Sequence, residues 1–233
     1  MIRPLLSALM LSTLFAATLS AADAEEGFVS MFNGKDLTGW EGKPDGWTVE
    51  DGAITGRSTK EKPCPTAHYL MWRTDKPADF ELRLSYRIVV GNSGIQFRSR
   101  EIPNWDTRGY QADLEAGPTW SGALFEHARG GIAMRGTKVV IAADGTKQVT
   151  KVADSNELQK KIKPNEWNEY RVIARGPEIT LSINGVVMAQ ATDRDAKQAA
   201  RDGVIALQMH PGPPMTVQFK DLRIKILKLE EGR

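Results

Sequence analysis

Three stretches of the chain alternate apolar residues with polar residues that could do chemistry. The polar sets are Gln96 with Arg98, Gln111 with Asp113, and Gln208 with His210. Residues i and i+2 of a β-strand point to the same side, so each set shares one sheet face and leaves the other face to apolar neighbours. A plain solvated face alternates in the same way, but there Lys, Glu and Thr are common. Amide, guanidinium, carboxylate and imidazole groups together favour a site that binds a polar substrate and moves protons.

Asp113 and His210 are the first candidates for proton transfer. Asp113 could also form a structural ion pair with Arg98 or Arg100 across the sheet. His210 precedes the rigid segment Pro211-Gly212-Pro213-Pro214, which could hold the imidazole in a cleft or simply offer it a carbonyl to bond. We predict catalytic roles for both residues.

Glu126 is the third catalytic candidate, and it adjoins His127. A regular strand points neighbours to opposite faces, so only one of the two can reach a site. Glu126 is in phase with Leu124 and needs a bulge to do so. Arg129 follows, and the two glycines after it permit either close approach of a ligand or a turn.

Trp105 and Trp120 lie in loops that contain Pro or Gly, where an exposed indole could stack on a sugar ring. Trp47, Trp72 and Trp167 lie in strand-like patterns and are expected in the core. The predicted substrate-binding residues are Gln96, Arg98, Gln111, Arg129, Gln208, Trp105 and Trp120.

The elements that must position these groups are strands. Asp51-Gly52 and Asn184-Gly185 each separate two alternating runs, and both dipeptides accept the positive φ of a two-residue hairpin turn. The longer runs are 80–90, 95–100, 110–115, 167–174, 204–210 and 215–229. Ten or more strands without a repeat predict an all-β fold, an antiparallel two-sheet sandwich of the jelly-roll type.

Helical patterns are short. Residues 154–162 and 193–201 could each form two turns, with Asp154 and Asp193 as N-caps. The polar stretch 135–163 is interpreted as an inserted loop.

Composition excludes several classes of protein. Lys and Arg number 31 against 29 Asp and Glu, a formal net charge of +2, which is too balanced for a protein that binds a nucleic-acid backbone. Three His and one Cys cannot build a Cys-rich zinc module or a disulfide framework. We predict no metal or other cofactor, and we expect Cys64 to be buried.

Residues 1–22 have the pattern of a secretory signal peptide. Arg3 precedes an apolar run that ends in Ser20-Ala21-Ala22, and about 15 apolar residues fall short of the ~20 that span a bilayer. We therefore expect a single domain over 23–233, periplasmic or secreted, with no stable membrane anchor. N-terminal sequencing of the native protein tests this expectation.

Six ordered motifs give the chain its resemblance to a known family. They are FNGKDLTGW at 32–40, NSGIQFRS at 92–99, GYQAD at 109–113, EWN at 166–168, ING at 183–185 and ALQMH at 206–210. Together they resemble the 3-keto-disaccharide hydrolase family, built on a concanavalin-like jelly roll. Gln111 stands where many members carry Glu.

The resemblance implies action on a carbohydrate, specifically a 3-keto-glycoside or 3-keto-disaccharide. In that chemistry a base removes the C2 proton, the C1 substituent is eliminated and water adds back. Two alternatives remain. A conventional glycosidase could use Asp113 and Glu126 as paired carboxylates, and a non-catalytic carbohydrate-binding module would need no acid or base.

Overall fold

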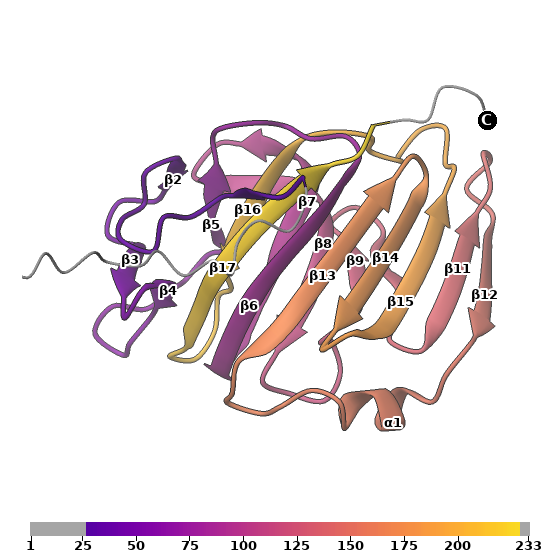
Figure 1. Ribbon diagram of the computed structural model, residues 1–233. Coiled ribbons are helices and arrows are strands. Elements are labelled where there is room, and N and C mark those ends of the chain that lie inside the picture. Colours follow the sequence, from indigo (N-terminus) through magenta and orange to yellow (C-terminus); the bar gives the residue numbers. More distant parts are fainter. Residues whose placement is uncertain (1–26, 229–233) are drawn as a thin grey trace, which may run out of the picture.

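The computed structural model describes residues 27–228, so the predicted signal peptide lies outside the described residues. Two β-sheets pack face to face, as Figure 1 shows, with the larger sheet in front and the smaller one behind. This confirms the predicted all-β sandwich. All strand pairs within the sheets are antiparallel except β11 with β15, which is parallel.

Seventeen strands and one short helix are described within residues 27–228. The ten-stranded sheet contains β1 (Val29–Ser30), β3 (Trp47–Glu50), β4 (Ala53–Arg57), β6 (Phe80–Val90), β11 (Thr137–Ile141), β12 (Lys147–Lys151), β13 (Asn168–Arg175), β14 (Glu178–Ile183), β15 (Val186–Asp193) and β17 (Thr216–Ile226). The seven-stranded sheet contains β2 (Trp40–Gly42), β5 (His68–Trp72), β7 (Asn92–Ile102), β8 (Asp106–Glu115), β9 (Leu124–Glu126), β10 (Gly130–Ala133) and β16 (Val204–Met209). The order in the smaller sheet is β10-β9-β8-β7-β16-β5-β2, which places β8, β7, β16 and β5 side by side.

Both predicted hairpin turns are confirmed. Asp51 and Gly52 join β3 to β4 with φ of 50° and 74°. Asn184 and Gly185 join β14 to β15 with φ of 51° and 77°. Positive φ at both central residues matches the right-handed twist of the paired strands, which explains why these dipeptides select the hairpin.

The apolar core fills the space between the sheets, and two tyrosines carry hydrogen bonds across it. Tyr110 of β8 donates to Asp193 of β15 at 2.5 Å. Tyr170 of β13 donates to the backbone carbonyl of Asp113 in β8 at 3.2 Å. Both rings are fully buried. These bonds link β8 to the larger sheet at two points along the strand. They therefore hold in place the strand that carries Gln111 and Asp113.

The sequence placed Arg98 on the same face as Gln96, and this prediction is wrong because β7 contains a β-bulge. The pairing with β8 shifts between Phe97 and Arg100, and Arg98 has a φ of 47°. An extra residue in one strand turns the side chains beyond it to the other face. The guanidinium of Arg98 is therefore buried, where it donates to the carbonyls of Ala78 and Gly176 and to Asp79.

Residues 135–163 do not form an inserted loop as predicted. They contain β11, β12 and the helix α1 (Ser155–Gln159), and the two strands extend the larger sheet beyond β15. Asp154 caps α1 by accepting from the backbone of residues 156 and 157, as expected. The second predicted helix, 193–201, is wrong: Asp193 ends β15 with its carboxylate buried, and turns follow.

Of the other residues predicted to be buried, all but Trp167 are in the core. Trp47, Trp72 and Cys64 are buried as predicted. Trp167 is only half-buried and precedes β13, because its ring packs under the cations of Arg87 and Lys220 on the outer face of the larger sheet. No helix in the described part of the chain is long and apolar enough to cross a membrane.

Replacing Arg98 should destabilise the fold rather than alter a binding surface. Arg98→Met leaves Asp79 buried without its cation, and breaking a buried pair from one side costs about 3–5 kcal/mol. Arg100→Met, two residues along the same strand but exposed, should change the free energy of unfolding by no more than about 0.5 kcal/mol. Urea denaturation of both variants measures the difference, and equal losses would contradict the structural role of Arg98.

Candidate active site

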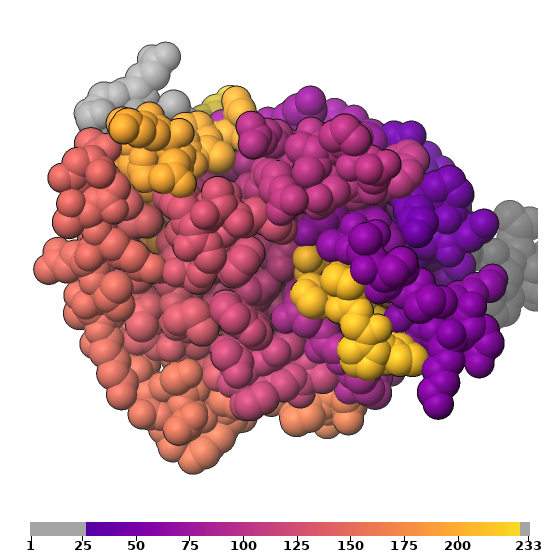
Figure 2. All heavy atoms as spheres, turned by 180° about the vertical axis from the view of Figure 1, so that it is seen from behind, coloured from indigo at the N-terminus to yellow at the C-terminus, as the bar shows by residue number. Residues whose placement is uncertain are grey.

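A pocket of about 410 Å³ opens on the outer face of the seven-stranded sheet. We call it the β8 pocket; its polar lining includes Tyr69, Gln111, Asp113, His127, Gln208 and His210. Figure 2 shows this face of the molecule, where the yellow loop after β16 lies beside the purple segment before β5. Strand β8 therefore supplies the floor, and loops from β16 and β5 rise beside it.

Asp113 is the buried carboxyl of the pocket. Its side chain is 4% exposed, and its Oδ1 accepts a 2.6 Å hydrogen bond from Gln111 Nε2. Burial raises the pKa of Asp113 to about 7, because the hydrogen bond from Gln111 offsets only part of the desolvation and Glu115 adds a like charge. Near neutral pH this group can both take and give a proton.

Three glutamines form a connected layer beside Asp113, as strand alternation predicts. Gln96 donates to Gln111 Oε1 at 2.8 Å, and Gln111 donates to Gln208 Oε1 at 3.2 Å. Gln208 then donates to the hydroxyl of Tyr69 at 2.8 Å. Gln111 and Gln208 line the pocket, whereas Gln96 is fully buried beneath it and positions the others.

The layer ends in a pair formed by Tyr69 and His127. The Tyr69 hydroxyl lies 3.1 Å from His127 Nε2. The other imidazole nitrogen, Nδ1, lies 3.2 Å from Gln96 Nε2 and 3.4 Å from the carbonyl of Gly109. A donor and an acceptor thus serve Nδ1, so either neutral tautomer of His127 has partners on both sides.

The pKa values of this pair keep both side chains uncharged near neutral pH. Burial raises the pKa of Tyr69 to about 12 and lowers the pKa of His127, so both groups are neutral at pH 7. In the tautomer with its proton on Nε2, the Tyr69 oxygen accepts from His127 and Gln208. Its own O–H is then available to an oxygen in the pocket.

His210 lines the opposite end of the pocket. Its Nδ1 donates to the carbonyl of Pro211 at 2.6 Å, which leaves Nε2 as an acceptor. Both interpretations offered by the sequence therefore hold: the imidazole bonds a loop carbonyl, and it also faces the pocket.

Trp120 contributes an aromatic wall, as predicted. Its ring packs edge-on against Phe125, with centroids 6.0 Å apart, and both line the pocket. Its backbone N–H is held at 2.7 Å by Glu115, and Arg135 donates to the carbonyls of Pro118 and Ser121 on either side. The loop therefore presents the indole in a fixed position.

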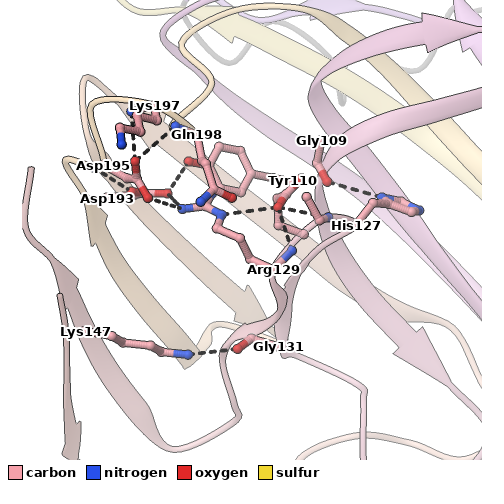
Figure 3. A network of polar contacts seen from close by, with 12 residues as sticks. Gly109, Tyr110, His127, Arg129, Gly131, Lys147, Asp193, Asp195, Lys197 and Gln198 are labelled. Carbon is pink, nitrogen blue, oxygen red and sulfur yellow. Dashed lines mark hydrogen bonds and ion pairs between the residues drawn. The ribbon is translucent and has the colours of Figure 1, made fainter. Parts of the chain in front are cut away.

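Besides Arg98, three predicted site residues lie outside the β8 pocket. Glu126 faces inward in phase with Leu124, as strand alternation warned, and accepts from Arg129 Nε at 3.2 Å. Figure 3 shows Arg129 between the sheets, where its Nη1 lies 2.7 Å from Asp193. Trp105 lines a separate hollow, in a turn where Asn104 and Trp105 both have positive φ.

Sequence reasoning missed Tyr69, Arg108 and His127; of the neighbours Glu126 and His127 it chose Glu126, but His127 lines the pocket. Tyr69 lies in a continuous buried run, where no alternation shows which face a residue takes. Arg108 borders the pocket together with Asp106, and its Nη2 lies 3.3 Å from the Asp106 carboxylate. The only sequence signal for Arg108 is the polar run before Gly109.

Among residues 27–228, no group of three or more His, Cys, Asp or Glu is arranged to hold a metal ion.

Comparison with known proteins gives a family and a fold. The 3-keto-alpha-glucoside-1,2-lyase-like domain family matches residues 27–225. A 3-keto-disaccharide hydrolase of Bacteroides thetaiotaomicron is 32% identical over 92 residues, 36% of this chain and 31% of that protein. The match thus spans about a third of that relative's length.

Solved structures share the sandwich at low sequence identity. A candidate glycosyl hydrolase of Parabacteroides distasonis matches with a TM-score of 0.57 and 20% identity over 87% of this chain and 94% of its own. The carbohydrate-binding module CBM66 of Bacillus subtilis matches with a TM-score of 0.54 and 16% identity over 82% and 98%. These likenesses establish the fold alone.

The raised pKa of Asp113 should make the free energy of unfolding depend on pH. The folded state keeps the proton from the ordinary carboxyl pKa up to about 7, so stability is full below about pH 4 and is lost as the pH rises through 7. Asp113→Asn removes this loss, so its stability relative to wild type should improve from pH 4 to pH 8, by up to about 4 kcal/mol. Urea denaturation across this range measures the change, and parallel profiles would contradict a raised pKa.

Proposed function

Because the chain belongs to the 3-keto-alpha-glucoside-1,2-lyase-like family, we propose that it cleaves the glycosidic bond of 3-keto-glycosides in the β8 pocket. The observation that supports this most is a buried carboxyl with a pKa of about 7 in one pocket with a hydrogen-bonded tyrosine and histidine pair. Such a set supplies a base and a hydrogen-bond donor.

The proposed reaction has an elimination and a hydration. The keto group at C3 acidifies the C2 hydrogen, and a base takes that proton while the C–H electrons form an enolate. When the enolate collapses, the C3 carbonyl reforms, a C1–C2 double bond forms, and the C1–O bond breaks with protonation of the departing oxygen. Water then adds to C1, and C2 regains a proton, so the net change is hydrolysis.

Asp113 serves as the base in this proposal. Its raised pKa brings the basicity of the carboxylate close to neutral pH, where a general base is most effective. Its Oδ2 has no hydrogen-bond partner among the described residues, while Gln111 holds Oδ1. The carboxyl is therefore oriented on one side and available on the other.

Donors on the opposite wall stabilise the negative charge and the leaving group. The Tyr69 hydroxyl and the exposed guanidinium of Arg108 border the pocket and can bond an oxygen that gathers charge. Arg98, which the sequence predicted to bind substrate, is buried and takes no part. The departing oxygen receives the proton that Asp113 took from C2, while His127 holds the Tyr69 hydroxyl and keeps a partner in either tautomer.

A conventional glycosidase would need Asp113 and Glu126 as paired carboxylates in one pocket. Glu126 bonds Arg129 and does not line the β8 pocket, so it does not face Asp113 across a bound sugar. Assays of the purified protein on a 3-keto-glucoside and on the unoxidised glucoside test the proposal. Release of the aglycone from the keto sugar alone is the expected result, and release from the unoxidised glucoside would overturn it, as would release from neither.

Asp113→Asn should lower kcat about 10²–10⁴-fold on the 3-keto-glucoside, because a general base contributes that much. In the wild type, kcat/KM should rise with pH up to about 7 and then level off, as the carboxyl of Asp113 loses its proton. Steady-state rates between pH 5 and pH 8.5 give both quantities.

The matched control is Asp144→Asn. Asp144 lies exposed in the turn between β11 and β12, and asparagine keeps its bond to the backbone of Thr146. This variant should retain wild-type turnover. Retention of turnover by Asp113→Asn as well would exclude Asp113 as the base.

A further inference from the structure

A second hollow adjoins the β8 pocket beside the bulged part of β7. It measures about 840 Å³ and shares two wall residues, Arg108 and His127, with the β8 pocket. We call it the basic hollow; its charged lining includes Lys76, Arg100, Glu101, Glu126, Lys197 and Asp202. Two compartments that share a wall can hold two parts of one ligand.

Strand β7 runs beneath both compartments. Asn92 lines the β8 pocket, and residues 98–101 of the same strand line the basic hollow. Gln96 and Arg100 pair with Gln111 and Arg108 of β8, and at about 3.3 Å per residue the three steps along β8 span about 10 Å. This length suits one sugar ring followed by a substituent, with the glycosidic oxygen near His127.

The charges that remain unpaired in the basic hollow are mostly positive. Glu101 is bound by Arg73 through hydrogen bonds of 2.6 and 3.0 Å, and Glu126 is bound by Arg129 at 3.2 Å. Each carboxylate thus has a guanidinium beside it, which it shares with a second carboxylate: Glu41 at Arg73 and Asp193 at Arg129. Three exposed cations have no carboxylate within ion-pair distance among the described residues: Lys76, Arg100 and Lys197. The remaining carboxylate of the hollow is that of Asp202.

The loop that carries Lys197 is held in place. Asp195 Oδ1 accepts from the backbone N–H groups of Lys197 and Gln198 at 2.8 and 3.0 Å. Figure 3 shows these bonds next to the pair between Arg129 and Asp193. Lys197 therefore lines the hollow from a fixed turn, together with Arg100.

The β8 pocket lacks this excess of cations. Its carboxyls Asp106 and Asp113 accompany one guanidinium, that of Arg108. An uncharged keto sugar suits the β8 pocket, and an anion suits the neighbouring space.

Resting on the proposed function, we infer that the basic hollow binds a leaving group that carries a carboxylate. The sugar occupies the β8 pocket, its C1 oxygen lies beside His127, and the carboxylate of the departing group meets Arg100 and Lys197. Long-range attraction between these charges favours binding, and dissolved salt weakens it.

The test compares two 3-keto-glucosides of the same shape, the 4-carboxyphenyl and the 4-carbamoylphenyl compound. At low ionic strength, kcat/KM should be about tenfold higher for the carboxylate, and the ratio should fall as salt is added. Arg100→Glu combined with Lys197→Glu should bring the ratio to one or below. Lys138→Glu, the same charge reversal at a single exposed position on β11 of the other sheet, should leave the ratio as in wild type.

The outcomes separate this inference from the proposed function. Turnover of both compounds without preference would overturn the basic hollow as a carboxylate site and leave the function intact. Turnover of neither would refute the function, and calorimetric titration of the same two compounds then decides the hollow. About tenfold tighter binding of the carboxylate, lost in the double variant, supports it; equal affinities overturn it.

Discussion

The packing of β7, β8 and β16 against the larger sheet is the constraint on which the pocket depends. Side chains such as Ile95, Tyr110 and Leu207 fill the core, and the two-residue period of a strand then turns their neighbours outward. The groups that Gln111, Asp113 and Gln208 present are placed by this packing and not by loops. The cross-sheet hydrogen bonds of Tyr110 and Tyr170 hold β8 at a fixed height above the larger sheet, so the floor of the pocket is rigid.

A layer of polar side chains buried on an outer sheet face is costly unless each group has a partner. The glutamine layer meets this condition, since each amide donates to the next and the series ends on Tyr69. Asp113 is the exception, because one hydrogen bond from Gln111 does not compensate for its burial. A carboxyl kept near neutrality in this way costs stability at high pH, and it is also the group best suited to exchange a proton with a substrate.

The bulge at Arg98 divides β7 into two parts with different roles. Before it, the strand supplies Gln96 to the polar layer; after it, the strand supplies Arg100 to the basic hollow. The bulged residue itself crosses to the inner side, where it binds Asp79 and the turn at Gly176. One irregularity thus both anchors the end of the sandwich and divides the strand between the β8 pocket and the basic hollow.

The sequence by itself determined the sandwich, the two hairpins and the shared face of Gln111 and Asp113. All of these follow from local turn chemistry and from the period of a strand, which need no distant partner. Only the tertiary structure decided that Arg98 and Arg129 serve the interior, because a bulge and a cross-sheet ion pair are set by residues far along the chain. The same holds for Tyr69, since a strand buried on both faces carries no alternation. Its role arises where β5 lies next to β16 and places the hydroxyl between Gln208 and His127.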